Sequence, residues 1–285
     1  MSENNNILRG VDQFYLATPE LFLFSSILLL IPLKLFFFKN KVFKYSNKFS
    51  YLTIFITLIL VLFLPYKGEA FYGLFFTDDF HKFIKSLILV CIFFVLLVSK
   101  NKSEIEGINF PEFNLLTLLS TFGMLVAVSS NSLMTLYLSL ELQALPIYIL
   151  CTLRNKDLRS SESGLKYFLL GSLSSGFLLF GISLIYGFSG SVSYTEIMHS
   201  DIKSNLGLNF GLIFLISGIA FKISAVPFHM WAPDVYQGSP SPITLFVASA
   251  PKITAVSILI ILTYKVFKNV NHHWNDLLFV LSLAS

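Results

Sequence analysis

Apolar stretches long enough to cross a lipid bilayer recur along almost the whole chain. A transmembrane helix needs about 17–25 predominantly apolar residues, and stretches of that kind leave no room here for a separate soluble domain. Of the 285 residues, 55% are hydrophobic and 13% are charged, which is about half the charge of an average soluble domain. We therefore predict an all-α polytopic membrane protein.

The pattern predicts about eight complete spans and the start of a ninth. Six spans are expected near residues 19–38, 50–65, 82–99, 113–128, 132–152 and 163–187, and the seventh, broken, and the eighth within 213–264. The last apolar run is too short to cross a bilayer, so the sequence ends as if interrupted. We divide the chain into a three-helix region (1–110), a five-span region (111–270) and the start of span nine (271–285).

Basic residues in the loops predict the orientation of the spans. The loops after spans one, three and five are rich in lysine and arginine: Lys39, Lys41, Lys44, Lys48; Lys100, Lys102; Arg154, Lys156, Arg159. Loops of this kind face the inside compartment, which places the N-terminus outside. We interpret the formal net charge of +4 as this bias and expect no nucleic-acid partner.

Neither a metal site nor a redox centre is expected in this chain. Cys91 and Cys151 lie far apart in apolar runs, where buried free thiols are the simplest interpretation. Their spacing fits neither a disulfide framework nor a metal site. CxxC and GxGxxG patterns are also absent, so we expect no bound cofactor and no redox chemistry in this polypeptide.

Three charged residues lie well inside the apolar runs: Glu141, Lys222 and Lys252. A cation at mid-membrane costs ~2.5–3.5 kcal/mol on insertion scales, so a functional role is the default interpretation. Proline leaves the carbonyl four residues earlier without its helical partner, and unpaired carbonyls at membrane depth require protein or water. We therefore expect hydrated pockets at weakened helix positions, because each charge has a proline nearby: Pro146, Pro227 and Pro251.

Such residues are suited to relaying protons. An unperturbed lysine, with a pKa of ~10.4, releases its proton too slowly near neutrality, but burial and a nearby carboxylate shift lysine pKa values in opposite directions. We hypothesise that Glu141 and Lys222 form a modulating pair and that Lys252 is the next station. His229, just past the expected break, is either a structural donor or a further relay. The alternative is an ion pair that only holds helices in register.

Other polar residues have structural interpretations. Glu20 and Lys34 lie near the ends of span one, where snorkelling is expected. Glu162 and Lys166 are spaced i,i+4, which predicts a surface ion pair. Span six has a face of small residues that predicts close helix packing: Gly171, Ser174, Ser175 and Gly181. Three residues after the break are expected to shape a turn: Trp231, Asp234 and Tyr236.

Three segments carry a resemblance to a known family. They are YLSLELQALPIYIL, SESGLKYFLLGSLSSGFLLFGISLIYG and GIAFKISAVPFHMWAPDVYQGSPSPITLFVASAPK. They resemble the antiporter-like subunits of respiratory complex I, the proton-pumping NADH:ubiquinone oxidoreductase, above all chain 2 (subunit N). In that family a glutamate in span five and lysines in spans seven and eight form the first half-channel of an inverted repeat. Glu141, Lys222 and Lys252 match those positions, so the resemblance assigns region 111–270 to that repeat.

The resemblance implies a membrane-arm subunit that translocates protons during NADH:ubiquinone electron transfer. Flavin and iron–sulfur clusters would lie in other subunits, and chains 4L, 4 and 6 and lipids would be neighbours. Because members of this family have about fourteen spans with paired repeats, we expect a second chain to carry the missing repeat. A composition rich in Phe, Ile, Lys and Asn suggests a mitochondrial inner membrane, with a bacterial plasma membrane as the alternative. The competing functions are a stand-alone cation/proton antiporter and a non-pumping structural subunit.

Overall fold

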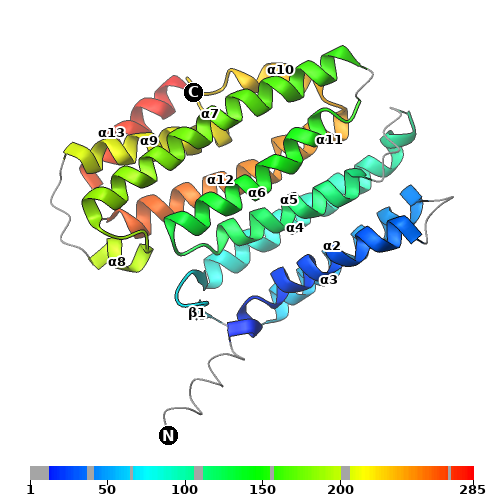
Figure 1. Cartoon of the computed structure of the whole chain (residues 1–285), viewed down its shortest axis with the longest axis horizontal. Helices are drawn as coiled ribbons and strands as arrows, with labels where there is room; N and C mark the ends of the chain where they lie inside the picture. Colours follow the sequence, from blue (N-terminus) through cyan, green and yellow to red (C-terminus); the bar gives the residue numbers. More distant parts are fainter. Residues whose placement is uncertain are drawn as a thin grey trace, which may run out of the picture.

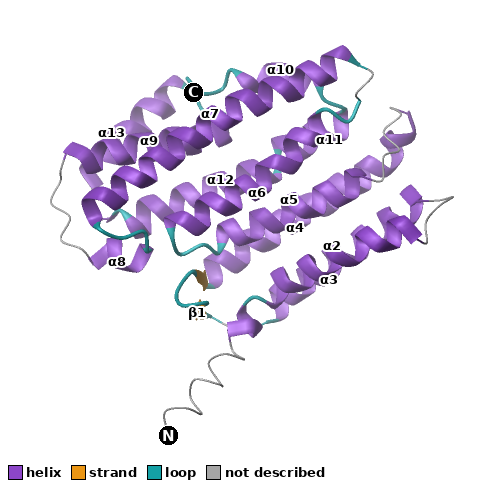
Figure 2. Ribbon diagram, viewed as in Figure 1, coloured by secondary structure: helices purple, strands orange, loops and turns teal. Residues whose placement is uncertain are grey.

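The computed structural model describes residues 13–36, 42–64, 67–105, 112–154, 157–199, 206–268 and 271–285. In these ranges the chain is helical apart from loops and one short hairpin (Figures 1 and 2). The elements are α2 (Thr18–Phe36), α3 (Val42–Phe63), β1 (Gly68–Ala70), β2 (Phe75–Thr77), α4 (Asp79–Ile105), α5 (Glu112–Val128), α6 (Leu133–Cys151), α7 (Leu158–Ser189), α8 (Tyr194–His199), α9 (Leu206–Ile223), α10 (Trp231–Gly238), α11 (Ser241–Ala248), α12 (Ala250–Ile261), the π-helix η1 (Leu262–Val266) and α13 (Asn271–Ala284).

Membrane-spanning helices account for most of this architecture. Within the described residues, six segments are long and apolar enough to cross a membrane: Tyr45–Phe63, Asp79–Ser99, Leu133–Cys151, Leu158–Ser189, Leu206–Ile223 and Ser241–Val266. Shorter apolar helices lie where spans one, four and nine were predicted: Thr18–Leu33, Glu112–Val128 and Trp274–Ala284. The prediction of an all-α polytopic membrane protein is confirmed. Three of the basic residues used to predict the orientation lie outside the described residues: Lys39, Lys41 and Lys156.

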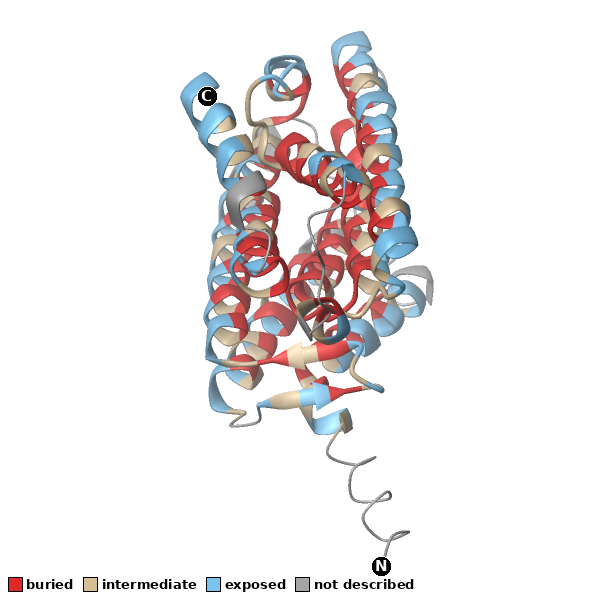
Figure 3. Cartoon of the chain, turned by 90° about the vertical axis from the view of Figure 1, so that its left-hand side faces the viewer, coloured by how far each residue is buried: buried red, intermediate tan, exposed pale blue. Residues whose placement is uncertain are grey.

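Helix α12 occupies a central place in the packing. It contacts α9, α4 and α5, while α5 packs along α6 and α7 packs along α9. Buried residues line the faces between the helices and exposed residues cover the outer faces (Figure 3). Many of those outer residues are large and apolar, Leu169 and Phe180 among them. An apolar outer surface is what a lipid environment requires, so the relay candidates lie inside a bundle that faces lipid.

Two of the spans are interrupted near their middle. Helix α9 ends at Ile223 and the chain resumes helical structure only at Trp231, with Ser224 in the left-handed region at φ 68°. This confirms the predicted break in span seven. The eighth span also breaks, because α11 ends at Ala248 and α12 begins at Ala250, with Ser249 between them at φ −111° and ψ −86°. Pro251 follows in the first turn of α12, a position where proline needs no amide hydrogen bond.

One end of the bundle is held together by short backbone contacts. The β1–β2 hairpin reaches the α5–α6 turn through a bridge between Phe75 and Ser130, and that turn pairs with Ser193 through Ser132. Helix α8 contacts η1, and the hairpin and α8 lie at the same end of the bundle in Figure 1. The loop biases predict that this end faces outside, and we call it the predicted outer end.

The small-residue face of span six packs directly against α9. A Cβ atom added to Gly181 would lie 2.7 Å from the carbonyl oxygen of Gly211 and 2.7 Å from the backbone nitrogen of Leu215. Such distances leave no room for a side chain without moving the backbone of α9. The prediction that small residues permit close helix packing here is confirmed.

Gly181 and Gly176 provide a matched test of this contact. We expect Gly181→Leu to destabilise the packing of α7 on α9 by at least about 1–3 kcal/mol, because overpacking forces the helices apart. Gly176→Leu is the control, since a Cβ there would have no neighbour within 4 Å. The amount of subunit retained in membranes and its thermal midpoint in detergent measure the difference. Equal values for the two variants would contradict the prediction.

Candidate functional site

Lys222 is a buried cation at the point where span seven breaks. It lies in the last turn of α9, its side chain is buried, and its Nζ has no hydrogen-bond partner among the described residues. The carboxylate of Glu141, half-buried in α6, acts electrostatically on this ammonium. No ion pair joins the two within the part of the chain that the structure describes. The predicted pair is therefore near but not in direct contact.

The helix ends give the two lysines different surroundings. The C-terminal end of a helix carries partial negative charge and the N-terminal end partial positive charge, and both effects fall off within about one turn. Lys222 lies at the C-terminal end of α9 and Lys252 in the first turn of α12. The backbone therefore favours a cation at Lys222 and disfavours one at Lys252, so the two stations are not equivalent.

Tyr236 lies beside Lys252. The Nζ of Lys252 is 5.5 Å from the centroid of the Tyr236 ring, within the range of a cation–π contact. The Tyr236 hydroxyl is buried and has no hydrogen-bond partner among the described residues. The sequence indicated only a turn-shaping role for Tyr236. No local signal set Tyr236 apart from its polar sequence neighbours Asp234 and Gln237.

An aromatic row fixes the break against the neighbouring helices. The Nε1–H of Trp231 donates to the carbonyl oxygen of Phe221 at 3.0 Å, and its ring stacks on Tyr167 at 4.4 Å between centroids. Tyr167 in turn meets Tyr148 edge to face at 4.9 Å, a geometry that stabilises aromatic pairs by about 0.5–1.5 kcal/mol. Glu141 acts electrostatically on Tyr148. The row therefore extends from the break to the surroundings of the carboxylate.

His229, Pro146 and Pro227 lie in three different surroundings, whereas Pro251 directly precedes Lys252 in α12. The His229 side chain is exposed, whereas that of Lys222 is buried and that of Lys252 half-buried, and the relay role of His229 stays a prediction. Pro146 lies inside α6, which continues unbroken through it. Pro227 lines a cavity of about 120 Å³ whose walls are mainly apolar side chains such as Leu173 and Phe228. This cavity is not the hydrated pocket that the sequence predicted beside the break.

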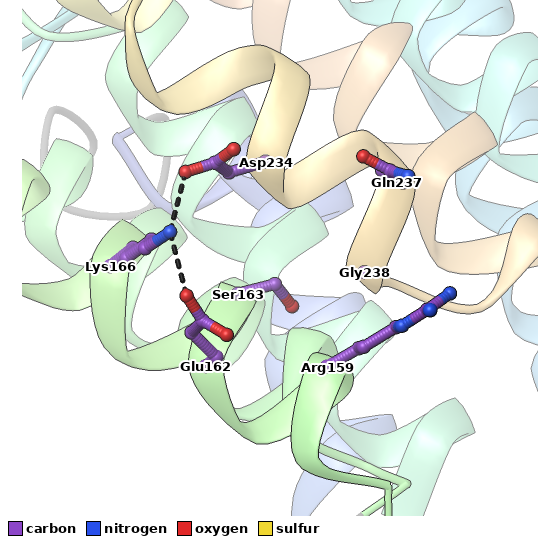
Figure 4. A pocket seen from close by; sticks show the side chains of 7 residues that line it. All are labelled: Arg159, Glu162, Ser163, Lys166, Asp234, Gln237 and Gly238. Carbon is purple, nitrogen blue, oxygen red and sulfur yellow. Dashed lines mark hydrogen bonds and ion pairs between the residues drawn. The ribbon is translucent and has the colours of Figure 1, made fainter.

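A polar pocket of about 280 Å³ opens between α7 and α10 (Figure 4), at the opposite end of the bundle from the hairpin (Figure 1). The ammonium of Lys166 bridges Glu162 and Asp234, at 2.8 Å from each carboxylate. The i,i+4 surface pair predicted for Glu162 and Lys166 is confirmed, and it extends to α10. All three side chains are substantially exposed. We interpret the group as a surface link between α7 and the segment that follows the break.

A second buried charge pair was not predicted from the sequence. Glu20 in α2 and Lys85 in α4 are joined by an ion pair of 2.6 Å, and their side chains are 4% and 2% exposed. The prediction that Glu20 snorkels toward the membrane surface is wrong, because its carboxylate turns inward to a cation on a neighbouring helix. The side chain of Lys34 lies outside the described residues.

The described residues contain no group of three or more His, Cys, Asp or Glu side chains that could hold a metal ion. Cys91 and Cys151 are both free, the first half-buried and the second buried.

The sequence matches a known family over more than half of its length. The matching family is described as "NADH:quinone oxidoreductase/Mrp antiporter, TM", and the match covers residues 130–285. The chain is 46% identical over 221 residues to NADH-quinone oxidoreductase subunit N 1 of Rhizobium meliloti, covering 77% of this chain and 46% of the relative. It is 42% identical over 277 residues to subunit N of Pelagibacter ubique, covering 96% and 58%. The chain thus spans about half the length of these relatives.

Solved structures show the same fold. A chain of respiratory complex I from Thermus thermophilus with bound aureothin superposes with a TM-score of 0.71 at 29% identity, covering 85% of this chain and 52% of that one. A chain of an archaeal membrane-bound sulfane sulfur reductase superposes with a TM-score of 0.78 at 23% identity, covering 96% and 57%. At that identity the second likeness concerns the fold alone.

Proposed function

Since this chain belongs to the NADH:quinone oxidoreductase/Mrp antiporter membrane family, we propose that it is a membrane-arm subunit of an NADH–quinone oxidoreductase and translocates protons. The observation that carries the proposal is Lys222, a buried ammonium without a direct partner at a helix break. A charge kept in such a place without an ion pair is expensive and has functional use. The subunit N relatives named above support the choice of complex.

The relay runs from Glu141 to Lys222 and then past Tyr236 to Lys252. Glu141 is close enough to act on Lys222 electrostatically but does not neutralise it in an ion pair. A pair in close contact would hold its proton, whereas a separated pair can strengthen or weaken its interaction through small movements. The unpartnered hydroxyl of Tyr236 supplies a group that both donates and accepts a hydrogen bond. Together these side chains can hold and pass a proton in the interior of the bundle.

Redox chemistry is assigned to other subunits in this proposal. Flavin and iron–sulfur clusters would reside there, and this chain would respond to their turnover through the neighbouring membrane subunits. The chain is a multi-pass membrane protein, and its named relatives are bacterial. They favour a bacterial plasma membrane over the mitochondrial inner membrane that the composition suggested.

A stand-alone antiporter is the alternative within the same family, because the family description includes Mrp antiporters. Purification of the tagged subunit under mild detergent separates the two. We expect it to emerge with a complex that contains flavin and iron–sulfur clusters and oxidises NADH. Purification of the intact chain without them would favour the antiporter.

Replacing Lys252 tests the relay itself. We expect Lys252→Met to reduce NADH-driven proton transport by about 10²-fold or more, the lower range for losing a positioned proton-transfer group. Lys67→Met is the control, because Lys67 is exposed and pairs with Asp79 at the surface. Quenching of a pH-sensitive dye in inverted membrane vesicles reports the transport, and immunoblots report assembly. Normal transport in assembled Lys252→Met complex would contradict the relay.

A further inference from the structure

A buried histidine lies at the predicted outer end, outside the relay described above. The side chain of His81 in α4 is 3% exposed, and its Nδ1 lies 2.6 Å from a carboxylate oxygen of Asp78, which is 37% exposed. The same oxygen accepts the backbone N–H of His81 at 3.0 Å. One member of this dyad is therefore shielded from solvent, while the other reaches it.

The state of Asp78 fixes the tautomer of the ring. Burial alone would raise the pKa of Asp78, but hydrogen bonds from the side chain and backbone of His81 and nearby positive charge hold that pKa below its usual value. Asp78 is therefore ionised near neutrality and only accepts hydrogen bonds. It follows that Nδ1 of His81 carries the proton and that Nε2 has a free lone pair, ready to accept a second proton.

The eighth span delivers a cation to the same place. Lys265 lies in the π-helix η1, and π-helical turns are often found at functional sites. Its Nζ is 3.6 Å from the centroid of the Phe76 ring, and the Phe76 ring packs at 5.3 Å against the ring of His81. The charge of Lys265 acts on both His81 and Asp78. The span that contains Lys252 thus ends beside the dyad.

A pocket of about 390 Å³ joins these groups. Its lining includes Asp78, His81, Tyr264, Lys265 and Lys268. This volume is more than enough for several water molecules, each of which occupies about 30 Å³ in the liquid. The dyad and the end of the eighth span therefore border one common space.

Several elements around His81 contribute a charge or an aromatic ring. Lys85 comes from α4, Asp78 from the position just before α4, Lys265 from η1 and the ring of Phe76 from β2. Lys85 is itself neutralised by Glu20 of α2, and Glu69 of β1 acts on Lys265. Lys265 is thus the cation whose approach or retreat alters the field at the imidazole.

We propose that His81 and Asp78 form a proton-release group, which passes protons from the end of the eighth span to the outside. This deepens the proposed function and rests on it. A proton arriving through the pocket binds Nε2 of His81, and the ring becomes an imidazolium. The ring then gives its Nδ1 proton to the Asp78 carboxylate, which releases it to outside water. Tautomer exchange of the neutral ring restores the starting state.

The test measures how proton transport depends on the pH of the outer compartment. The purified complex is reconstituted in proteoliposomes with the predicted outer end of the subunit facing the vesicle lumen. The lumen is buffered at a series of pH values, and NADH is added to the external medium. Transport by the wild type should fall at low lumenal pH, where the ring cannot lose its proton. Asp78→Asn should slow transport, because an amide cannot take up the Nδ1 proton, and it should also move this fall to lower pH by about one unit, because losing a neighbouring carboxylate makes the imidazolium a stronger acid.

Neighbouring residues supply the controls. Asp79→Asn removes an adjacent carboxylate that pairs with Lys67 at the surface, and it should leave the profile in place. His81→Gln keeps a donor for Asp78 but carries no extra proton, and it should slow transport by at least about tenfold, a conservative figure for losing a proton-transfer group. If His81→Gln reduces assembly, the Asp78→Asn profile decides, because that change leaves the buried ring in place.

The Lys222→Met variant separates failure of the release group from failure of the proposed function. If that variant stops transport while Asp78→Asn and His81→Gln both keep the wild-type profile and rate, the release group is wrong and the proposed function stands. If Lys222→Met transports normally, the proposed function fails and the release group falls with it. A profile that shifts in Asp78→Asn but not in Asp79→Asn supports the release group, since a purely structural role would lower the rate without moving the profile.

Discussion

Lys222→Met is expected to reduce NADH-driven proton transport by about 10²-fold or more, while the subunit remains folded in the membrane. Methionine has similar length and no charge, so it removes the ammonium at the end of α9 and fills the same space. Because the Lys222 ammonium is buried without a direct partner, its removal also relieves the free-energy cost of burying a charge. Stability should therefore be unchanged or higher, although transport is lost.

Dye quenching in vesicles measures transport for this variant, and the thermal midpoint of the purified complex measures stability. Lys166→Met is the matched control, because the Lys166 ammonium lies at the surface between Glu162 and Asp234 and takes no part in the relay. Its transport should resemble that of the wild type. A Lys222→Met complex that assembles and pumps normally would end the relay proposal, whatever its stability.

The buried pair of α2 and α4 should show the opposite behaviour in single and double variants. Glu20→Gln leaves the Lys85 ammonium buried without its counter-charge, which is expected to destabilise the subunit by about 3–5 kcal/mol. Replacing both, as Glu20→Leu with Lys85→Met, removes the charge entirely and should be neutral or stabilising by about 1–4 kcal/mol. The thermal midpoint in detergent and the amount of subunit in the membrane measure both variants.

The exposed pair of Lys67 and Asp79 is the control for this comparison. Breaking it through Asp79→Asn should change stability by less than about 1 kcal/mol, because water solvates the remaining charge. A Glu20→Gln variant as stable as Asp79→Asn would show that the Lys85 ammonium finds other compensation. A double variant less stable than the single one would show that the charges themselves hold α2 against α4.

The sequence predicted the features that depend on local composition. Apolar length marks a span wherever it occurs, which is why the membrane class and the placement of most spans are confirmed. The break after Lys222 was equally local, because Pro227 follows within a few residues of an otherwise continuous apolar run. Glycine and serine in span six likewise marked a close contact that the structure contains.

Features that depend on distant parts of the chain escaped the sequence. The Glu20–Lys85 pair joins spans one and three, and each residue alone resembles a charge at a span end. His229 is exposed because of the path of the loop after Ser224, which no periodicity reveals. Pro251 was expected to leave one carbonyl unpaired, four residues earlier, within a continuous helix. Instead the helix is interrupted at Ser249, and Pro251 lies in the first turn of the helix that follows. The contact of Tyr236 with Lys252 needs α10 and α12 to be neighbours.

The interruptions at Ser224 and Ser249 also have a mechanical consequence. An intact helix resists bending because every turn is cross-linked by backbone hydrogen bonds. Each of these two spans consists instead of two helical segments separated by a non-helical break. Each helical half can therefore rotate about the break without losing any of its own backbone hydrogen bonds. A displacement of one half of such a span is therefore taken up at the break, next to Lys222 and Lys252, so it changes the separation between the two stations while the uninterrupted helices around them keep their places.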